Sequence, residues 1–108
     1  MARRRKFSET VKKDLQNSEE FRRAFLSEAL TCMASGDVET GKIVLREYIN
    51  GTVGFMKAAD ALGRSPKSLM RMLSSSGNPQ ARNLLELVAY LQKTEGATAE
   101  VRFADRAA

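Results

Sequence analysis

Apolar residues recur three or four positions apart along most of this chain, a period that predicts helices rather than strands. A first helix is expected to begin at Ser8, because serine is a common N-cap residue. A second is expected after Ser18, where two acidic residues favour a helix N-terminus, and Gly36 ends its apolar stripe. Asp37 then predicts the start of a third helix, which runs to about Asn50.

Residues 52–73 have the spacing of a helix-turn-helix, in which a tight turn joins two short helices. Ala59 supplies the small side chain that such helices need where they cross, and Gly63 supplies the positive φ needed in the turn. Ser65 is expected to cap the second helix, and Pro66 to occupy its first position, which needs no N–H donor. The residues of this segment expected to point inward are Leu62, Leu69 and Met72.

The second helix of this segment carries polar and basic residues on its expected outward face, and these are the candidate DNA contacts. Arg71 suits bidentate contact with guanine, Lys67 can reach a base or a phosphate, and Ser68 is a shorter, less selective hydrogen-bonding group. Arg64, in the turn, is better placed for backbone phosphate, and Ser65 belongs to the same candidate set. The alternative interpretation is that all of these are simply solvated side chains on a helical hairpin.

The last third of the chain first breaks and then changes its pattern. Residues 74–79 combine glycine and proline in an expected loop, after which a further helix ends before Gly96. In the tail, Val101 and Phe103 alternate with other residues, a period of two that predicts a short strand. Because strand backbone groups need hydrogen-bond partners, this strand would pair with a second copy or another protein, or stay loose.

Composition adds a charge argument to this picture. A chain of 108 residues with 43% hydrophobic residues is long enough for one domain with a modest core. Lysine and arginine number 18 against 13 aspartate and glutamate, a net charge of +5. This excess is typical of nucleic-acid binders, because cations that replace counterions on DNA supply much of the non-specific affinity. Part of it lies in the basic run 3–6 (Arg3, Arg4, Arg5, Lys6), which is either an arm that reaches DNA or a solubilising tail.

The residue types also exclude several kinds of chemistry. Without histidine, a Ser-His or Cys-His catalytic pair is impossible, and the acidic residues form no recognisable catalytic pair. The single Cys32 cannot build a zinc site, and its place on an apolar stripe predicts a packing residue. No apolar run is long enough to span a membrane. We therefore expect a cytoplasmic protein that is not an enzyme, binds no metal or cofactor, and has no membrane partner.

The segment from Asp37 to Phe103 resembles the lambda-repressor-like, or Xre-type, helix-turn-helix domains. Within that family it is similar to the probable addiction-module antidote proteins of the HigA antitoxin class. The resemblance is carried by the pair Gly36 and Asp37, the core AADALGRSPKSLMRML, and the turn SGNP before LLELVAYL. The earlier segment FRRAFLSEAL also looks like that subgroup. The chain departs from the common pattern at Arg64, where many relatives have an aliphatic residue.

This resemblance implies a particular all-α fold. We expect a lambda-repressor-like five-helix domain with an N-terminal helical extension and a short C-terminal strand. The expected divisions are an arm and helical extension over residues 1–36, the DNA-binding domain over residues 37–96, and a strand or tail over residues 97–108.

Proteins of this class bind operator DNA as dimers, repress their own operon and neutralise a RelE/HigB-like toxin that cleaves messenger RNA. The resemblance therefore implies a sequence-specific DNA-binding antitoxin of a type II toxin-antitoxin module. Its expected partners are double-stranded operator DNA, a second copy of the chain and a RelE-like toxin, for which no binding residues can be matched. The residues that would read bases by motif position are Ser65, Lys67, Ser68 and Arg71. Two alternatives are an orphan or phage-type regulator without a toxin, and a protein-interaction module that has lost DNA binding.

Overall fold

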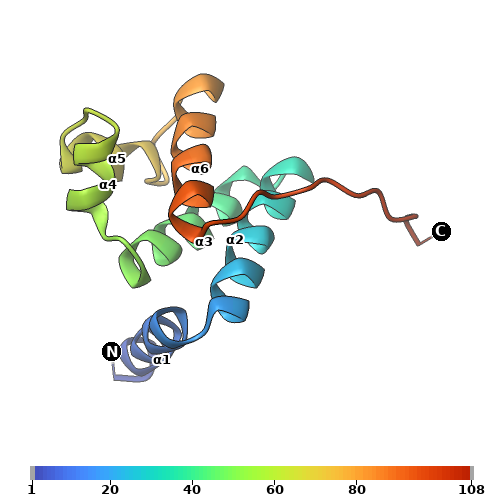
Figure 1. Cartoon of the computed structure of the whole chain (residues 1–108), viewed down its shortest axis with the longest axis horizontal. Coiled ribbons are helices and arrows are strands. Elements are labelled where there is room, and N and C mark those ends of the chain that lie inside the picture. The colour runs from blue at the N-terminus through green and yellow to red at the C-terminus, as the bar shows by residue number, and fades with distance from the viewer. Residues whose placement is uncertain (1, 108) are drawn as a thin grey trace.

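The protein is all-α in the part of the chain that the structure describes. The computed structural model describes residues 2–107, and the side chains of residues 9–107. The basic side chains at positions 3–6, expected to form either an arm that reaches DNA or a solubilising tail, lie outside the described side chains. In chain order the helices are α1 (Ala2–Asn17), α2 (Glu19–Ala34), α3 (Val38–Gly51), α4 (Phe55–Ala61), α5 (Pro66–Met72) and α6 (Ala81–Glu95), as Figure 1 shows.

Side-chain caps begin two of the first three helices where the sequence predicts them. The Ser18 hydroxyl accepts a hydrogen bond from the Phe21 amide at 3.0 Å and starts α2. Asp37 accepts from the Thr40 amide at 3.2 Å and starts α3, and this hydrogen bonding holds the pKa of Asp37 below its ordinary value. The expected start of the first helix at Ser8 is wrong, because α1 already begins at Ala2 and Ser8 lies inside it.

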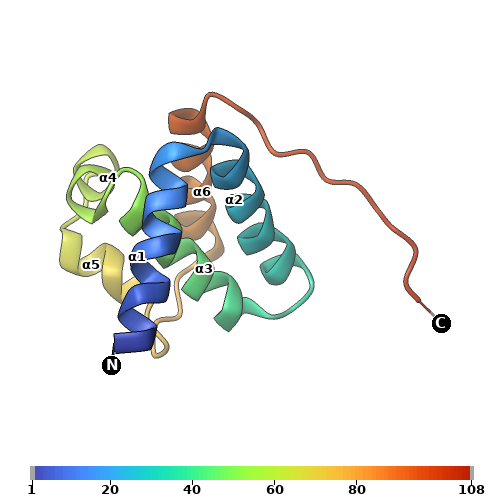
Figure 2. The same ribbon diagram turned by 90° about the horizontal axis from the view of Figure 1, so that it is seen from below.

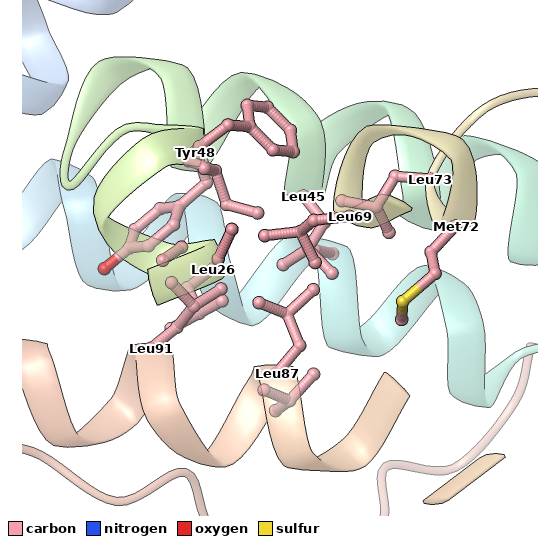
Figure 3. Close-up of a cluster of buried hydrophobic side chains, with 14 of the residues drawn as sticks. Leu26, Leu45, Tyr48, Leu69, Met72, Leu73, Leu87 and Leu91 are labelled. Carbon is pink, nitrogen blue, oxygen red and sulfur yellow. The ribbon is translucent and has the colours of Figure 1, made fainter. Parts of the chain in front are cut away.

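One hydrophobic core joins all six helices. Its fully buried side chains come from α1, α2 and α3 as well as from the later helices, and Figure 3 shows Leu45, Leu69 and Leu87 meeting at its centre. Gly41 lets α2 approach α3 closely, because a Cβ there would lie 3.0 Å from the Ala29 carbonyl oxygen. The helices of residues 1–36 thus bury side chains in the same core as those of residues 37–96.

A buried polar network ties the C-terminal end of α6 to α2 and α3. Tyr48 donates its hydroxyl proton to Oε1 of Glu95 at 2.5 Å, and Nε of Arg22 donates to the same oxygen at 2.8 Å. Arg22 also donates to the Leu15 carbonyl at 3.1 Å, which brings the end of α1 into the network. Burial, together with the hydrogen bond to Glu95, raises the pKa of the Tyr48 hydroxyl well above its ordinary value.

Because the pKa of Tyr48 is raised in the folded protein, its contribution to the free energy of unfolding falls at alkaline pH. Because the folded pKa lies above the unfolded value of about 10, the contribution is fully present below pH 10 and is lost as pH rises beyond it. We expect wild type to exceed Tyr48→Phe in free energy of unfolding by about 1 kcal/mol at pH 7. Urea unfolding should show this difference shrinking between about pH 10 and 11. A difference that stays constant over that range would contradict the assignment.

The C-terminal tail forms no strand, contrary to the expectation for Val101 and Phe103. Residues 97–107 have no regular secondary structure, and Figures 1 and 2 show the tail leading away from the helices. Its base is tied to α6, where the Ala99 amide donates to Oε1 of Gln92 at 2.7 Å. Val101 and Phe103 are 90% and 95% exposed. The physical reason is that residues 2–107 contain no other strand that could pair with the tail.

None of the helices described between residues 2 and 107 combines the length and apolar character needed to cross a membrane.

Candidate nucleic-acid interface

The turn between α4 and α5 is built by local interactions that the sequence predicts. Gly63 has a φ of +67° and donates its amide to the Asp60 carbonyl at 3.2 Å. Ser65 then caps α5, its hydroxyl accepting from the Ser68 amide at 3.1 Å, and Pro66 is the first helical residue. These predictions for the turn and the cap are confirmed, and together they fix the angle at which α5 leaves α4.

The inner face of α5 is fully enclosed by the core. Leu69 has no exposed surface and Met72 is only 9% exposed, and both side chains point toward the other labelled core residues in Figure 3. From α4, Ala59 is fully buried, as expected for a helix that crosses its neighbour closely. Because buried side chains on this face hold α5 in place, its opposite face is presented as a fixed surface.

The candidate residues differ in how much of the side chain is available on that surface. Lys67 and Arg71, one helical turn apart, are exposed, whereas Ser68 and Arg64 are half-buried. Ser65 is exposed, but its hydroxyl already accepts the capping hydrogen bond. The structure therefore brings Lys67 and Arg71 together on the outward face of α5. Ser65 instead serves as the N-cap of this helix.

The two exposed cations are not neutralised by neighbouring acids. Among the described side chains, neither Lys67 nor Arg71 forms an ion pair. The basic side chains that do pair with carboxylates lie on α2, α3 and α6. An unpaired arginine and lysine at this spacing can bind phosphate or base-edge acceptors without first breaking an internal interaction.

Sequence reasoning missed one residue on this surface. Met70 is 47% exposed and lies in α5 between Lys67 and Arg71. The signal was present, because Met70 follows Lys67 by three positions and so shares its side of the helix. An apolar side chain on the outward face can contact the methyl group of thymine.

Metal-ligand clusters and the single cysteine are the other candidate chemical groups among the described residues. Residues 9–107 hold no cluster of three or more cysteine and acidic side chains placed to bind a metal ion. Cys32 is half-buried in α2 and donates its thiol to Glu28 at 3.6 Å. Desolvation, reinforced by the hydrogen bond to Glu28, raises the pKa of the Cys32 thiol above its ordinary value, which disfavours the reactive thiolate.

No protein-family model, curated protein or solved structure matches the chain.

Proposed function

We propose that this protein is a sequence-specific DNA-binding antitoxin of a type II toxin-antitoxin module, which represses its own operon and neutralises a RelE/HigB-like toxin. One observation supports the DNA-binding part: α5, held against the core by Leu69, presents Lys67 and Arg71 exposed after a tight turn, and neither forms an ion pair with another described side chain. The antitoxin part is supported by the resemblance of residues 37–103 to HigA-type antidote proteins.

In this proposal α4 and α5 are the helix-turn-helix of a lambda-repressor-like domain, and α5 enters the major groove. Arg71 donates to the O6 and N7 acceptors of a guanine, and Lys67 contacts a phosphate or a base edge. Arg64, half-buried in the turn, contacts the phosphate backbone beside the groove. The net charge of +5 supplies the non-specific attraction that holds the protein near DNA.

We further propose that the protein binds its operator as a homodimer. An α5 of seven residues buries too little surface to be highly selective by itself. Two copies would read half-sites about one helical turn, roughly 34 Å, apart. The tail, with Val101 and Phe103 exposed, is the candidate surface for the second copy or the toxin, because an extended segment can pair with the tail of a second copy or with the strand edge of another protein.

A titration tests the proposal. The protein is added to the labelled duplex from immediately upstream of its own gene, called here the upstream duplex, and separately to a scrambled duplex of the same composition. We expect binding to the upstream duplex to be tighter by about 10³-fold or more. Both affinities should fall with added salt, since phosphate contacts release counterions. Equal affinities for the two duplexes would remove the repressor role.

A further inference from the structure

Two basic side chains of α3 hold the main chain just beyond α5. Nζ of Lys42 donates to the carbonyl oxygens of Ser74 at 2.9 Å and of Gly77 at 2.8 Å. One turn further along α3, Nη1 of Arg46 donates to the Leu73 carbonyl at 2.8 Å. We call Lys42 and Arg46 the α3 clamp. Its three hydrogen bonds join residues that are 27 to 35 positions apart in the chain.

Lys42 is a buried charge whose hydrogen-bonding capacity is filled. Its side chain is only 2% exposed, and Nζ also forms an ion pair with Glu39 at 2.9 Å. The ammonium group has three donors, and it meets two carbonyls and one carboxylate. Because a buried ammonium without partners is costly in free energy, movement of the loop after α5 away from Lys42 is unfavourable.

The clamped loop is in direct contact with the last turn of α5. Ser74 donates its amide to the Arg71 carbonyl at 3.2 Å and its hydroxyl to the same oxygen at 2.8 Å. Gly77 lies so close to this turn that a Cβ would be 2.1 Å from the Arg71 carbonyl oxygen and 2.8 Å from that of Met72. The main chain of Arg71 therefore blocks a shift of the loop towards α5, and a shift away would break two hydrogen bonds to the Arg71 carbonyl oxygen.

We propose that the α3 clamp positions α5 for base recognition by fixing the main chain of Arg71 through residues 73–77. This inference rests on the proposed DNA-binding function. Lys42 and Arg46 are positioning residues, because their hydrogen bonds go to main-chain carbonyls of the same chain. The enclosed ammonium of Lys42 has no free donor for a phosphate. Loss of the clamp should lower discrimination between DNA sequences while leaving non-specific affinity almost unchanged.

The test measures the ratio of dissociation constants for scrambled and upstream duplex. We expect Arg46→Met to lower this ratio about tenfold, within the range for loss of one good base contact, and to change scrambled-duplex affinity by less than about twofold. Arg46→Lys keeps a donor for the Leu73 carbonyl and should retain the ratio. Because the clamp acts through Arg71, Arg46→Met combined with Arg71→Ala should discriminate no worse than Arg71→Ala alone.

Lys42→Met is the second variant, since it keeps most of the aliphatic stem and removes the donors. Lys93→Met is its matched charge control, because Lys93 is an exposed lysine on α6 outside the clamp. Leu91→Ala is the stability control, since Leu91 is a buried core residue of α6. All titrations are done at a temperature where circular dichroism shows each variant folded, and neither control should change the ratio.

The possible results distinguish failure of the α3 clamp's positioning role from failure of the DNA-binding proposal. If wild type prefers the upstream duplex and Arg46→Met keeps that ratio within about twofold, the clamp has no positioning role and DNA binding stands. An equal loss in Leu91→Ala would also overturn the inference, because general destabilisation would then suffice. So would full additivity of Arg46→Met and Arg71→Ala. If wild type itself shows no preference, the DNA-binding proposal fails and the inference fails with it.

Discussion

Replacement of Leu69 by alanine is expected to lower the free energy of unfolding by about 2 to 5 kcal/mol, the usual range for truncating a buried leucine. Leu69 has no exposed surface and lies at the meeting point of α3, α5 and α6. The substitution removes buried methyl groups and leaves a cavity that the short α5 cannot easily fill by moving, because its two ends are held by Ser65 and by the α3 clamp. Urea unfolding followed by circular dichroism measures the change.

The matched control is Leu85→Ala, the same substitution on the surface of α6. Leu85 is 62% exposed, so its truncation should change the free energy of unfolding by less than about 0.5 kcal/mol. If the two variants were equally stable, Leu69 would not be a core residue and α5 would not be seated as described. Burial of Leu69 would then not explain how the outward face of α5, with Lys67 and Arg71, is held in a fixed position.

Arg71→Ala and Lys67→Ala are expected to affect DNA binding in different ways. Arg71→Ala should cost about 1 to 3 kcal/mol at the base pair that Arg71 reads, because the bidentate contact with guanine is lost. Lys67→Ala, where the lysine meets phosphate, should weaken all sequences alike and reduce the salt dependence by about one counterion. Titrations of each variant against the upstream duplex and single-base-pair variants of it measure both effects.

Lys93→Ala is the control for the loss of one positive charge, because this exposed lysine lies on α6 rather than on α5. It should lower the affinity for every duplex less than Lys67→Ala does. A uniform loss from both Arg71→Ala and Lys67→Ala would contradict the division of labour, since it would make Arg71 a phosphate contact as well.

Local features of the fold were predictable because each depends on a few neighbouring residues. The cap at Ser65 and the turn at Gly63 follow from side-chain capping and from the positive φ that glycine adopts. The same local reasoning misplaced the start of α1 at Ser8, since a serine inside a helix cannot be told from a cap by its identity alone. It also predicted a strand from the alternation of Val101 and Phe103, although a strand depends on a partner that alternation does not supply.

The contacts that hold α5 and α6 in place were not predictable in this way. Lys42 meets the loop after α5 across 32 to 35 positions, and Tyr48 meets Glu95 across 47. Charged residues are usually solvated, so a sequence pattern gives them no partner. A signal for Lys42 did exist, because it shares the helical face of Leu45 and Ile49, which are fully buried.

The central claim is that the outward face of α5 contacts DNA, and the upstream-duplex titration tests it most directly when the amide signals are followed residue by residue. We expect the largest chemical-shift changes at residues 64–71, and small changes along α2, which lies outside the proposed contact surface. If the changes were confined to the tail at residues 97–107 while the signals of Lys67 and Arg71 stayed unchanged, the account would be contradicted.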